Sequence, residues 1–228
     1  MNVAPIIYIF IGPPGSGKGT LAQECVGRYG WANLSTGALC RQHISENTDI
    51  GKQIDPIIKS GKLIPDELVT SMVDSWLSRQ LALSSGVILD GYPRTKHQVS
   101  MLLDVLRSKY AESDIRVVKF DIADEIVVQR LSSRLMCQNK DCQRVYSVLP
   151  EAKLAPIREG ICDSCASSLV QRADDKPEVI KDRLKIFHDS DPSCFFLEKG
   201  LSVRVIDASK PFEIIVDDFE QLVKCECA

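Results

Sequence analysis

The stretch IIYIFIGPPGSGKGT, residues 6–20, decides the fold. Its first six residues are apolar, which indicates a buried strand, and apolar spacing at Leu21, Cys25 and Tyr29 indicates a helix directly after the loop. Glycines allow the loop backbone to curl around phosphate oxygens, the helix adds its positive N-terminal end, and Lys18 adds a mobile cation. We therefore predict a loop that binds a nucleoside triphosphate, because a strand before and a helix after disfavour the alternative of a glycine turn without a ligand.

Further along the chain, strand-like and helix-like segments alternate. Residues 87–89, 117–122 and 203–206 are largely apolar rather than alternating, as in strands buried on both faces. Helical spacing lies between them, for example over residues 126–131 after the cap candidate Asp124. This order predicts an α/β fold in which helices cover a parallel sheet of the P-loop type.

Two stretches interrupt the alternation. Residues 37–66 hold helical pieces broken by glycine and proline, without a strong strand. Residues 137–170 hold four cysteines together with prolines and a glycine, and we expect them to form a small separate unit.

The composition excludes several classes of protein. The chain has 228 residues, 44% of them apolar, and a formal charge of -3, so the basic surface of a dedicated nucleic-acid binder is not expected. No apolar run approaches the roughly 20 residues that span a bilayer, so we expect no membrane association. Nine cysteines are an odd number in a chain long enough to fold without disulfides, which favours a reducing compartment, the cytoplasm.

The loop departs from the general pattern because Gly19 separates Lys18 from Thr20, and in this it resembles the nucleoside monophosphate kinases, among them the adenylate kinases. The resemblance continues in the order of the family's motifs through most of the chain. These motifs are STG at 35–37, GKLIPDE at 61–67, LDGYPRT at 89–95, QRADD at 171–175 and DASKP at 207–211. The resemblance implies a core of residues 1–34, 67–129 and 173–228, an AMP-binding insert at 35–66, and a lid at 130–172.

The implied reaction is transfer of a phosphoryl group from MgATP to AMP, which gives two ADP. The attacking phosphate oxygen is already anionic, so positioning and charge neutralisation matter more than a general base. The resemblance implies catalytic roles for Lys18, Asp90, Arg94, Arg130, Arg134, Arg172 and Arg183. It implies ATP contacts from Gly12, Gly15, Ser16, Gly17, Lys18, Gly19, Thr20, Arg130 and Lys210. It implies AMP contacts from Thr36, Arg41, Ile64, Gly91, Arg94, Gln98, Arg172 and Arg183.

Several of these assignments have an alternative. The arginines could be ordinary surface residues, Asp90 could cap a strand end rather than hold the water shell of Mg²⁺, and Gln98 could face solvent on a helix. Thr36 favours AMP because the pyrimidine-monophosphate kinases usually carry alanine there and have a shorter lid. Ala38 departs from the family, which has an acidic residue directly after the STG motif.

The cysteine spacing predicts a structural metal site. Four residues separate Cys137 from Cys142, two separate Cys162 from Cys165, and nineteen lie between the pairs. Four thiolates at such spacing fit a zinc ribbon, and the resemblance implies such a metal in the lid of bacterial-type adenylate kinases, whose first pair usually has two intervening residues. The alternative is four reduced thiols without a metal. A closed Zn²⁺ site would shape the lid without taking part in the chemistry.

Three other functions compete with this interpretation. A related kinase could use another donor or acceptor, such as GTP or UMP. A GTPase switch is disfavoured because the NKD at residues 139–141 lacks the Asn-Lys-x-Asp spacing, and a nucleic-acid module built on the cysteines is disfavoured by the acidic balance. We expect a monomer that uses ATP, AMP and ADP.

Overall fold

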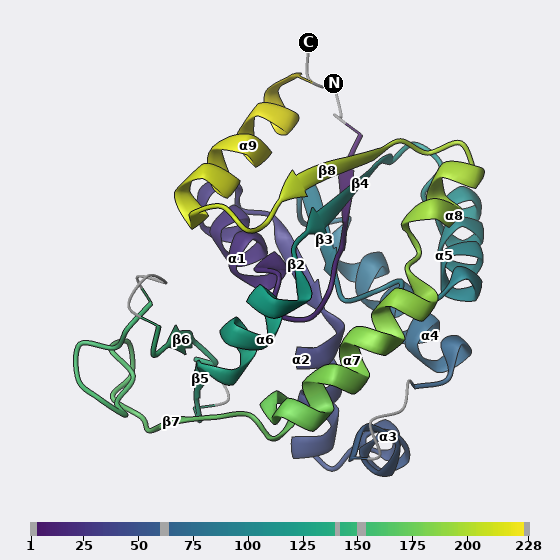
Figure 1. The fold of residues 1–228 in the computed structure, drawn as a ribbon. Helices are drawn as coiled ribbons and strands as arrows, with labels where there is room; N and C mark the ends of the chain where they lie inside the picture. The colour runs from purple at the N-terminus through teal and green to yellow at the C-terminus, as the bar shows by residue number, and fades with distance from the viewer. Residues whose placement is uncertain (1–3, 60–63, 140–141, 150–153, 226–228) are drawn as a thin grey trace.

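The computed structural model describes residues 4–59, 64–139, 142–149 and 154–225, so the first three residues of the GKLIPDE motif lie outside the described residues. Its centre is a parallel five-stranded sheet in the order β2-β3-β1-β4-β8 (Figure 1). The strands are β1 (Ile6–Ile11), β2 (Ala32–Ser35), β3 (Gly86–Asp90), β4 (Asp114–Asp121) and β8 (Val203–Asp207). The predicted α/β fold with a parallel sheet is confirmed.

Helices cover both faces of this sheet, as the apolar strands predict. On β1, Ile7, Ile9 and Ile11 pack into one buried cluster, while Tyr8 and Phe10 pack into another on the opposite face. The first cluster includes residues of α4 (Asp66–Gln80), α5 (Lys96–Lys109) and α8 (Ser193–Glu198). The second includes residues of α1 (Lys18–Tyr29) and α9 (Phe212–Cys225). The central strand is therefore shielded from water on both sides.

Two details of the predicted elements are wrong. Residues 203–206 form an edge strand rather than a strand buried on both faces, and Val205 is 63% exposed. Only β4 pairs with β8, and the outer position leaves this strand partly in contact with solvent. Asp124 is the first residue of α6 (Asp124–Ser132), not its cap, which is Ala123.

Two structures extend beyond the core at the interruptions seen in the sequence. Residues 36–59 form α2 (Thr36–Ser45) and α3 (Asp49–Lys59), which pack against each other. Residues 134–170, called the cysteine unit below, contain an antiparallel sheet in the order β6-β5-β7. Its strands are β5 (Arg134–Cys137), β6 (Val145–Ser147) and β7 (Leu169–Val170). The remaining elements are the 3-10 helix η2 (Ala173–Asp175) and α7 (Pro177–Ser190).

The strand register brings the predicted nucleotide motifs together at one edge of the core sheet. Phe10 is paired with Asp90, and Asp90 with Ser35, so β1, β3 and β2 end side by side. The carboxyl edge of a parallel sheet is where α/β proteins bind ligands. Within the described residues, no helix is long and apolar enough to cross a bilayer.

Candidate nucleotide site

The loop between β1 and α1 has a backbone that only glycine adopts easily. Gly15 has φ 78° and Gly17 has φ 93°, both in the left-handed region. A side chain at Gly12 would place its Cβ 2.9 Å from Phe120, which is closer than atoms in contact approach. The glycines therefore allow the loop to turn tightly over β4, and α1 begins at Lys18 directly after it.

The Lys18 side chain curls back over this loop. Its Nζ donates to the carbonyl oxygens of Gly12 at 2.8 Å and Pro13 at 2.7 Å, and to Ser16 Oγ at 3.0 Å. Loss of water lowers the pKa of the ammonium to about 8, an effect that Asp90 opposes and that Arg94 and other arginines strengthen. An arriving phosphate would reverse this, because it supplies the negative charge that the loop lacks.

Asp90 ends β3 beside the first turn of α1. Its Oδ2 lies 3.2 Å from the position that a Cβ at Gly19 would take, so the inserted glycine leaves room for the carboxylate to approach this turn. Thr20 follows in the same turn and supplies a hydroxyl. Carboxylate, hydroxyl and water oxygens are the ligands that Mg²⁺ prefers, so these residues fit an ion bound together with a triphosphate.

The residues predicted to contact AMP, the acceptor of the phosphoryl group, lie around the loop after β3. Thr36 Oγ1 donates to the carbonyl of Gly91 at 2.9 Å, and Arg94 Nε donates to the same oxygen at 2.7 Å. Gln98 is only 3% exposed and accepts a hydrogen bond from the Arg94 backbone N–H at 2.7 Å. The alternative that Gln98 faces solvent is therefore wrong.

Arg41 on α2 has an unsatisfied buried atom. Its Nε is buried and has no hydrogen-bond partner among the described residues. Burial lowers its pKa to about 10, and the nearby Arg172 adds to the lowering. A buried donor without a partner lowers the stability of the fold, and an anionic ligand that accepted a hydrogen bond from this guanidinium would remove that penalty.

Three more of the predicted arginines converge on η2. Arg134 binds Asp175 with Nε at 2.8 Å and an Nη at 2.6 Å, and Arg172 binds Asp174 in the same two-point way at 2.9 and 2.7 Å. Arg183 contacts both carboxylates, at 3.2 and 3.4 Å. Burial lowers the pKa of Arg183 to about 10, although Asp174 opposes this. These arginines are therefore not ordinary, independent surface residues.

Asp174 and Asp175 were not assigned roles from the sequence, although both stand in the QRADD motif. Asp175 is fully buried. Burial alone would raise the pKa of Asp174, but Arg172, Arg183 and Arg134 outweigh it and the pKa is lowered. The signal that could have identified both acids is their position directly after an arginine expected to bind phosphate.

Three other predicted site residues have different surroundings. Lys210 Nζ binds Asp218 at 2.9 Å, so its side chain is held by α9. Ile64 packs against the apolar cluster formed by α2, α3 and α4. Burial by itself lowers the pKa of Arg130, without the coupling to other charges seen for Arg183. Among the described residues, no hydrogen bond or ion pair links these three side chains to the η2 arginines.

Comparison with known proteins agrees with this geometry. A family model described as adenylate kinase matches residues 10–195. The chain belongs to the adenylate kinase family. It is 36% identical over 209 residues to an adenylate kinase of Fervidobacterium nodosum, which covers 91% of this chain and 93% of the relative. It is 38% identical over 214 residues to an adenylate kinase of Treponema denticola, which covers 93% of this chain and 96% of the relative.

The cysteine unit of this adenylate kinase family member gathers its four thiols at one point. Cys137 Sγ lies 3.3 Å from Cys165 Sγ, Cys142 Sγ lies 3.7 Å from Cys162 Sγ, and all four lie within 4.8 Å of one another. A tetrahedral zinc with bonds of about 2.3 Å would need sulfur separations of roughly 3.8 Å. None of the four forms a disulfide. The thiols therefore fit a closed structural metal site.

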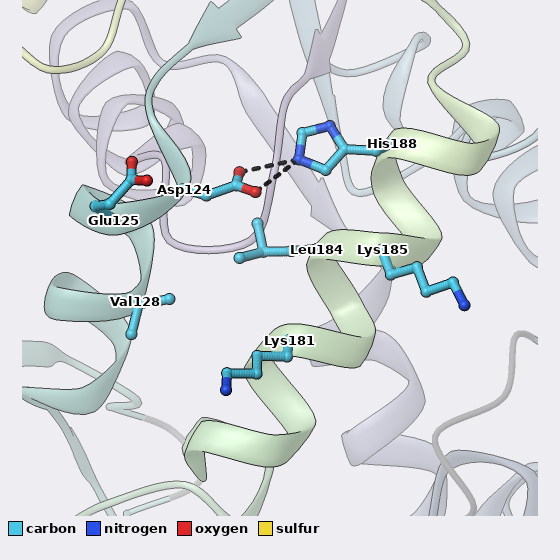
Figure 2. Close-up of a pocket in the computed structure, with 7 residues that line it drawn as sticks. All are labelled: Asp124, Glu125, Val128, Lys181, Leu184, Lys185 and His188. Carbon is cyan, nitrogen blue, oxygen red and sulfur yellow. Dashed lines mark hydrogen bonds and ion pairs between the residues drawn. The ribbon is translucent and has the colours of Figure 1, made fainter.

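A separate hollow of about 410 Å³ lies between α6 and α7, the helices on either side of the cysteine unit (Figure 2). His188 Nε2 bonds Asp124 at 2.9 Å across the mouth of this hollow, and Val128 and Leu184 lie below the contact. None of the residues that line it was predicted from the sequence to bind nucleotide. The contact joins the two helices from which the cysteine unit extends.

Proposed function

We propose that this chain catalyses reversible phosphoryl transfer from MgATP to AMP, which gives two ADP. Membership of the adenylate kinase family supports the reaction class, a nucleoside monophosphate kinase. The predicted residues at the carboxyl edge of the sheet support the assignment of donor and acceptor sites to this chain.

One observation carries the proposal: the cations at this edge outnumber the carboxylates that face them. Lys18, Arg94, Arg134 and Arg183 influence one another electrostatically, and Arg41 is coupled to the same group. The carboxylates that oppose them are Asp90, Asp174 and Asp175. The pKa of Lys18 falls to about 8 because its ammonium has lost water without gaining enough negative charge. Two polyphosphate chains would supply the missing charge.

The proposed roles follow from position. The glycine loop and Lys18 hold the β- and γ-phosphates of ATP through inward-facing N–H groups and the ammonium. Arg94, which contacts Gly91, and Arg41, which lies on α2, hold the phosphate of AMP. Arg134, Arg172 and Arg183 neutralise charge on the transferred group, which is the main demand of phosphoryl transfer. Asp90 and Thr20 would hold Mg²⁺, which would neutralise charge on the bound ATP.

We further propose that the lid at residues 130–172 and the AMP-binding insert at residues 35–66 close over the bound nucleotides. Expulsion of water would prevent hydrolysis of ATP and would strengthen the field of the arginines. Zn²⁺ held by Cys137, Cys142, Cys162 and Cys165 would give the cysteine unit, too small for a large core, a fixed shape. We also propose that the protein acts as a monomer in the cytoplasm.

The test is ADP formation from ATP with each of AMP, UMP, CMP and GMP as acceptor. We expect AMP to be preferred, and we expect Arg94→Ala to lower kcat/KM for AMP by about 10² or more. Arg107→Ala, which removes an exposed arginine from α5, is the matched control and should leave the rate within about twofold. A wild-type preference for UMP or GMP, or an equal loss in both variants, would contradict the proposal.

A further inference from the structure

Asp66 joins the start of α4 to the residues proposed for the acceptor. Its Oδ1 accepts from Gln98 Nε2 at 2.7 Å, and its Oδ2 accepts from Thr95 Oγ1 at 3.0 Å. At the opposite end of the same amide, Gln98 Oε1 accepts from the Arg94 backbone N–H at 2.7 Å. Asp66 is therefore connected through one side-chain amide to the backbone of Arg94.

These partners permit only one orientation of the Gln98 amide. A carboxylate can only accept, and a backbone N–H can only donate, so Nε2 must face Asp66 and Oε1 must face Arg94. The side chain is 3% exposed, so water cannot easily replace either partner. A reversed amide would place its oxygen against the carboxylate and its NH₂ group against the N–H, and both hydrogen bonds would be lost.

The fixed orientation of the Gln98 amide matters because the amide can still form two more hydrogen bonds. Nε2 carries a second N–H and Oε1 a second lone pair, and within the described residues no hydrogen bond uses either. Adenine presents a donor at its 6-position and an acceptor at N1, whereas guanine and hypoxanthine present an acceptor at O6 and a donor at N1. An amide whose orientation matches the donor and acceptor of adenine therefore does not match those of guanine or hypoxanthine.

Resting on the proposed function and on the contact with AMP that the resemblance implies for Gln98, here taken to be a contact with the base, we propose that Asp66 is a positioning residue for acceptor specificity. It holds the Gln98 amide in the orientation that reads a 6-amino purine, and so excludes 6-oxo purine monophosphates. Asp66 does not itself touch the reacting phosphates in this proposal. Its effect on specificity passes through Gln98 to the base.

A purely structural role is the competing explanation, because an acid in the first turn of a helix is favourable. Glu67 provides the same charge one residue further along α4 but is 76% exposed, and it approaches His97 Nε2 at 3.9 Å rather than Gln98. Glu67→Gln is therefore a matched control for loss of charge at this helix end.

The experiment measures kcat and KM for AMP and for IMP with wild-type protein, Asp66→Asn and Glu67→Gln. Asparagine has the shape of aspartate but can offer either an oxygen or an NH₂ group to Gln98, so the Arg94 N–H is left as the remaining constraint on the orientation of the amide. We expect the ratio of kcat/KM for AMP to that for IMP to fall about threefold or more in Asp66→Asn, because a reversed amide then loses one hydrogen bond, that of the Arg94 N–H, rather than two. The change should lie in KM for AMP, with kcat within about twofold, because base contacts bind ground state and transition state alike.

The ratio is independent of the fraction of protein that is folded, since both acceptors are measured on the same sample. Equal losses with AMP and IMP in Asp66→Asn, or an equal change of the ratio in Glu67→Gln, would overturn the role of Asp66 while leaving the proposed function intact. Failure of the wild-type protein to phosphorylate AMP would overturn the proposed function, and this inference with it.

Discussion

ATP binding to this protein should take up a proton at alkaline pH, because free Lys18 titrates far below an ordinary lysine. Its pKa is about 8, against 10.5 for an exposed lysine. At pH 9 about nine-tenths of the free protein would carry a neutral Lys18, whereas at pH 7 about one-tenth would. A bound triphosphate should restore the charged ammonium, so uptake of about 0.9 proton per ATP is expected at pH 9 and about 0.1 at pH 7.

The direction of the effect on affinity follows from the same shift. The pKa is lowered in the free protein and restored in the complex, so affinity is constant well below pH 8 and falls as pH rises through 8. Between pH 7 and pH 9 the loss is about tenfold, or about 1.4 kcal/mol. With Mg²⁺ in excess the terminal phosphate of ATP is ionised at both pH values, so the nucleotide adds little to this change.

Isothermal titration calorimetry in two buffers of different ionisation enthalpy measures the uptake directly. Lys18→Met is the matched control, since methionine has a similar length and no charge. The variant should bind ATP more weakly, with an affinity that changes little between pH 7 and pH 9. Uptake below about 0.2 proton by wild-type protein at pH 9, or an undiminished uptake by Lys18→Met, would refute this account of the loop.

Three further outcomes are expected. Arg94→Lys should lower kcat/KM for AMP by about 10- to 100-fold in the ADP-formation assay, because an ammonium cannot hold a phosphate at two points, and an unchanged rate would contradict the assignment. Elemental analysis should find about one zinc per chain in wild-type protein and much less in Cys142→Ser, whereas Cys194→Ser, at an exposed thiol, should retain the metal. Leu77→Ala should lower the free energy of unfolding by about 3 kcal/mol, seen as a fall of roughly 6–12 °C in Tm, because Leu77 is fully buried, and a fall below about 2 °C would contradict tight packing there.

The sequence predicts the core sheet well where local patterning and tertiary packing agree. The apolar run at residues 6–11 coincides with β1, because that strand is central and covered on both faces. The sequence predicts β8 less well, because valine is common in edge strands as well as in central ones. Only the strand order and the exposure of Val205 show that β8 lies at the edge of the sheet. The short β2 has one buried residue, Leu34, and therefore leaves almost no periodic signal.

For the site, motifs identify groups of side chains that are close together in the sequence but not their long-range partners. The glycine loop and the position of Asp90 after an apolar strand are readable because strand, turn and ligand contact lie within a few residues. The contact of Asp66 with Gln98 joins residues 32 positions apart. Its existence depends on how α4 packs against α5, which no local pattern records. The roles assigned to the site residues remain predictions until they are measured.

The acids of η2 explain how so many cations can gather before any nucleotide binds. Asp175 is fully buried and takes up the Nε edge of Arg134, and Asp174 does the same for Arg172. A guanidinium has five N–H donors, so a two-point contact on one edge leaves the others available to phosphate oxygens. The acids therefore fix the orientation of the arginines without using all of their donors. Little reorganisation is then needed when charge develops on the transferred group, which is the condition under which preorganised electrostatics contributes most to catalysis.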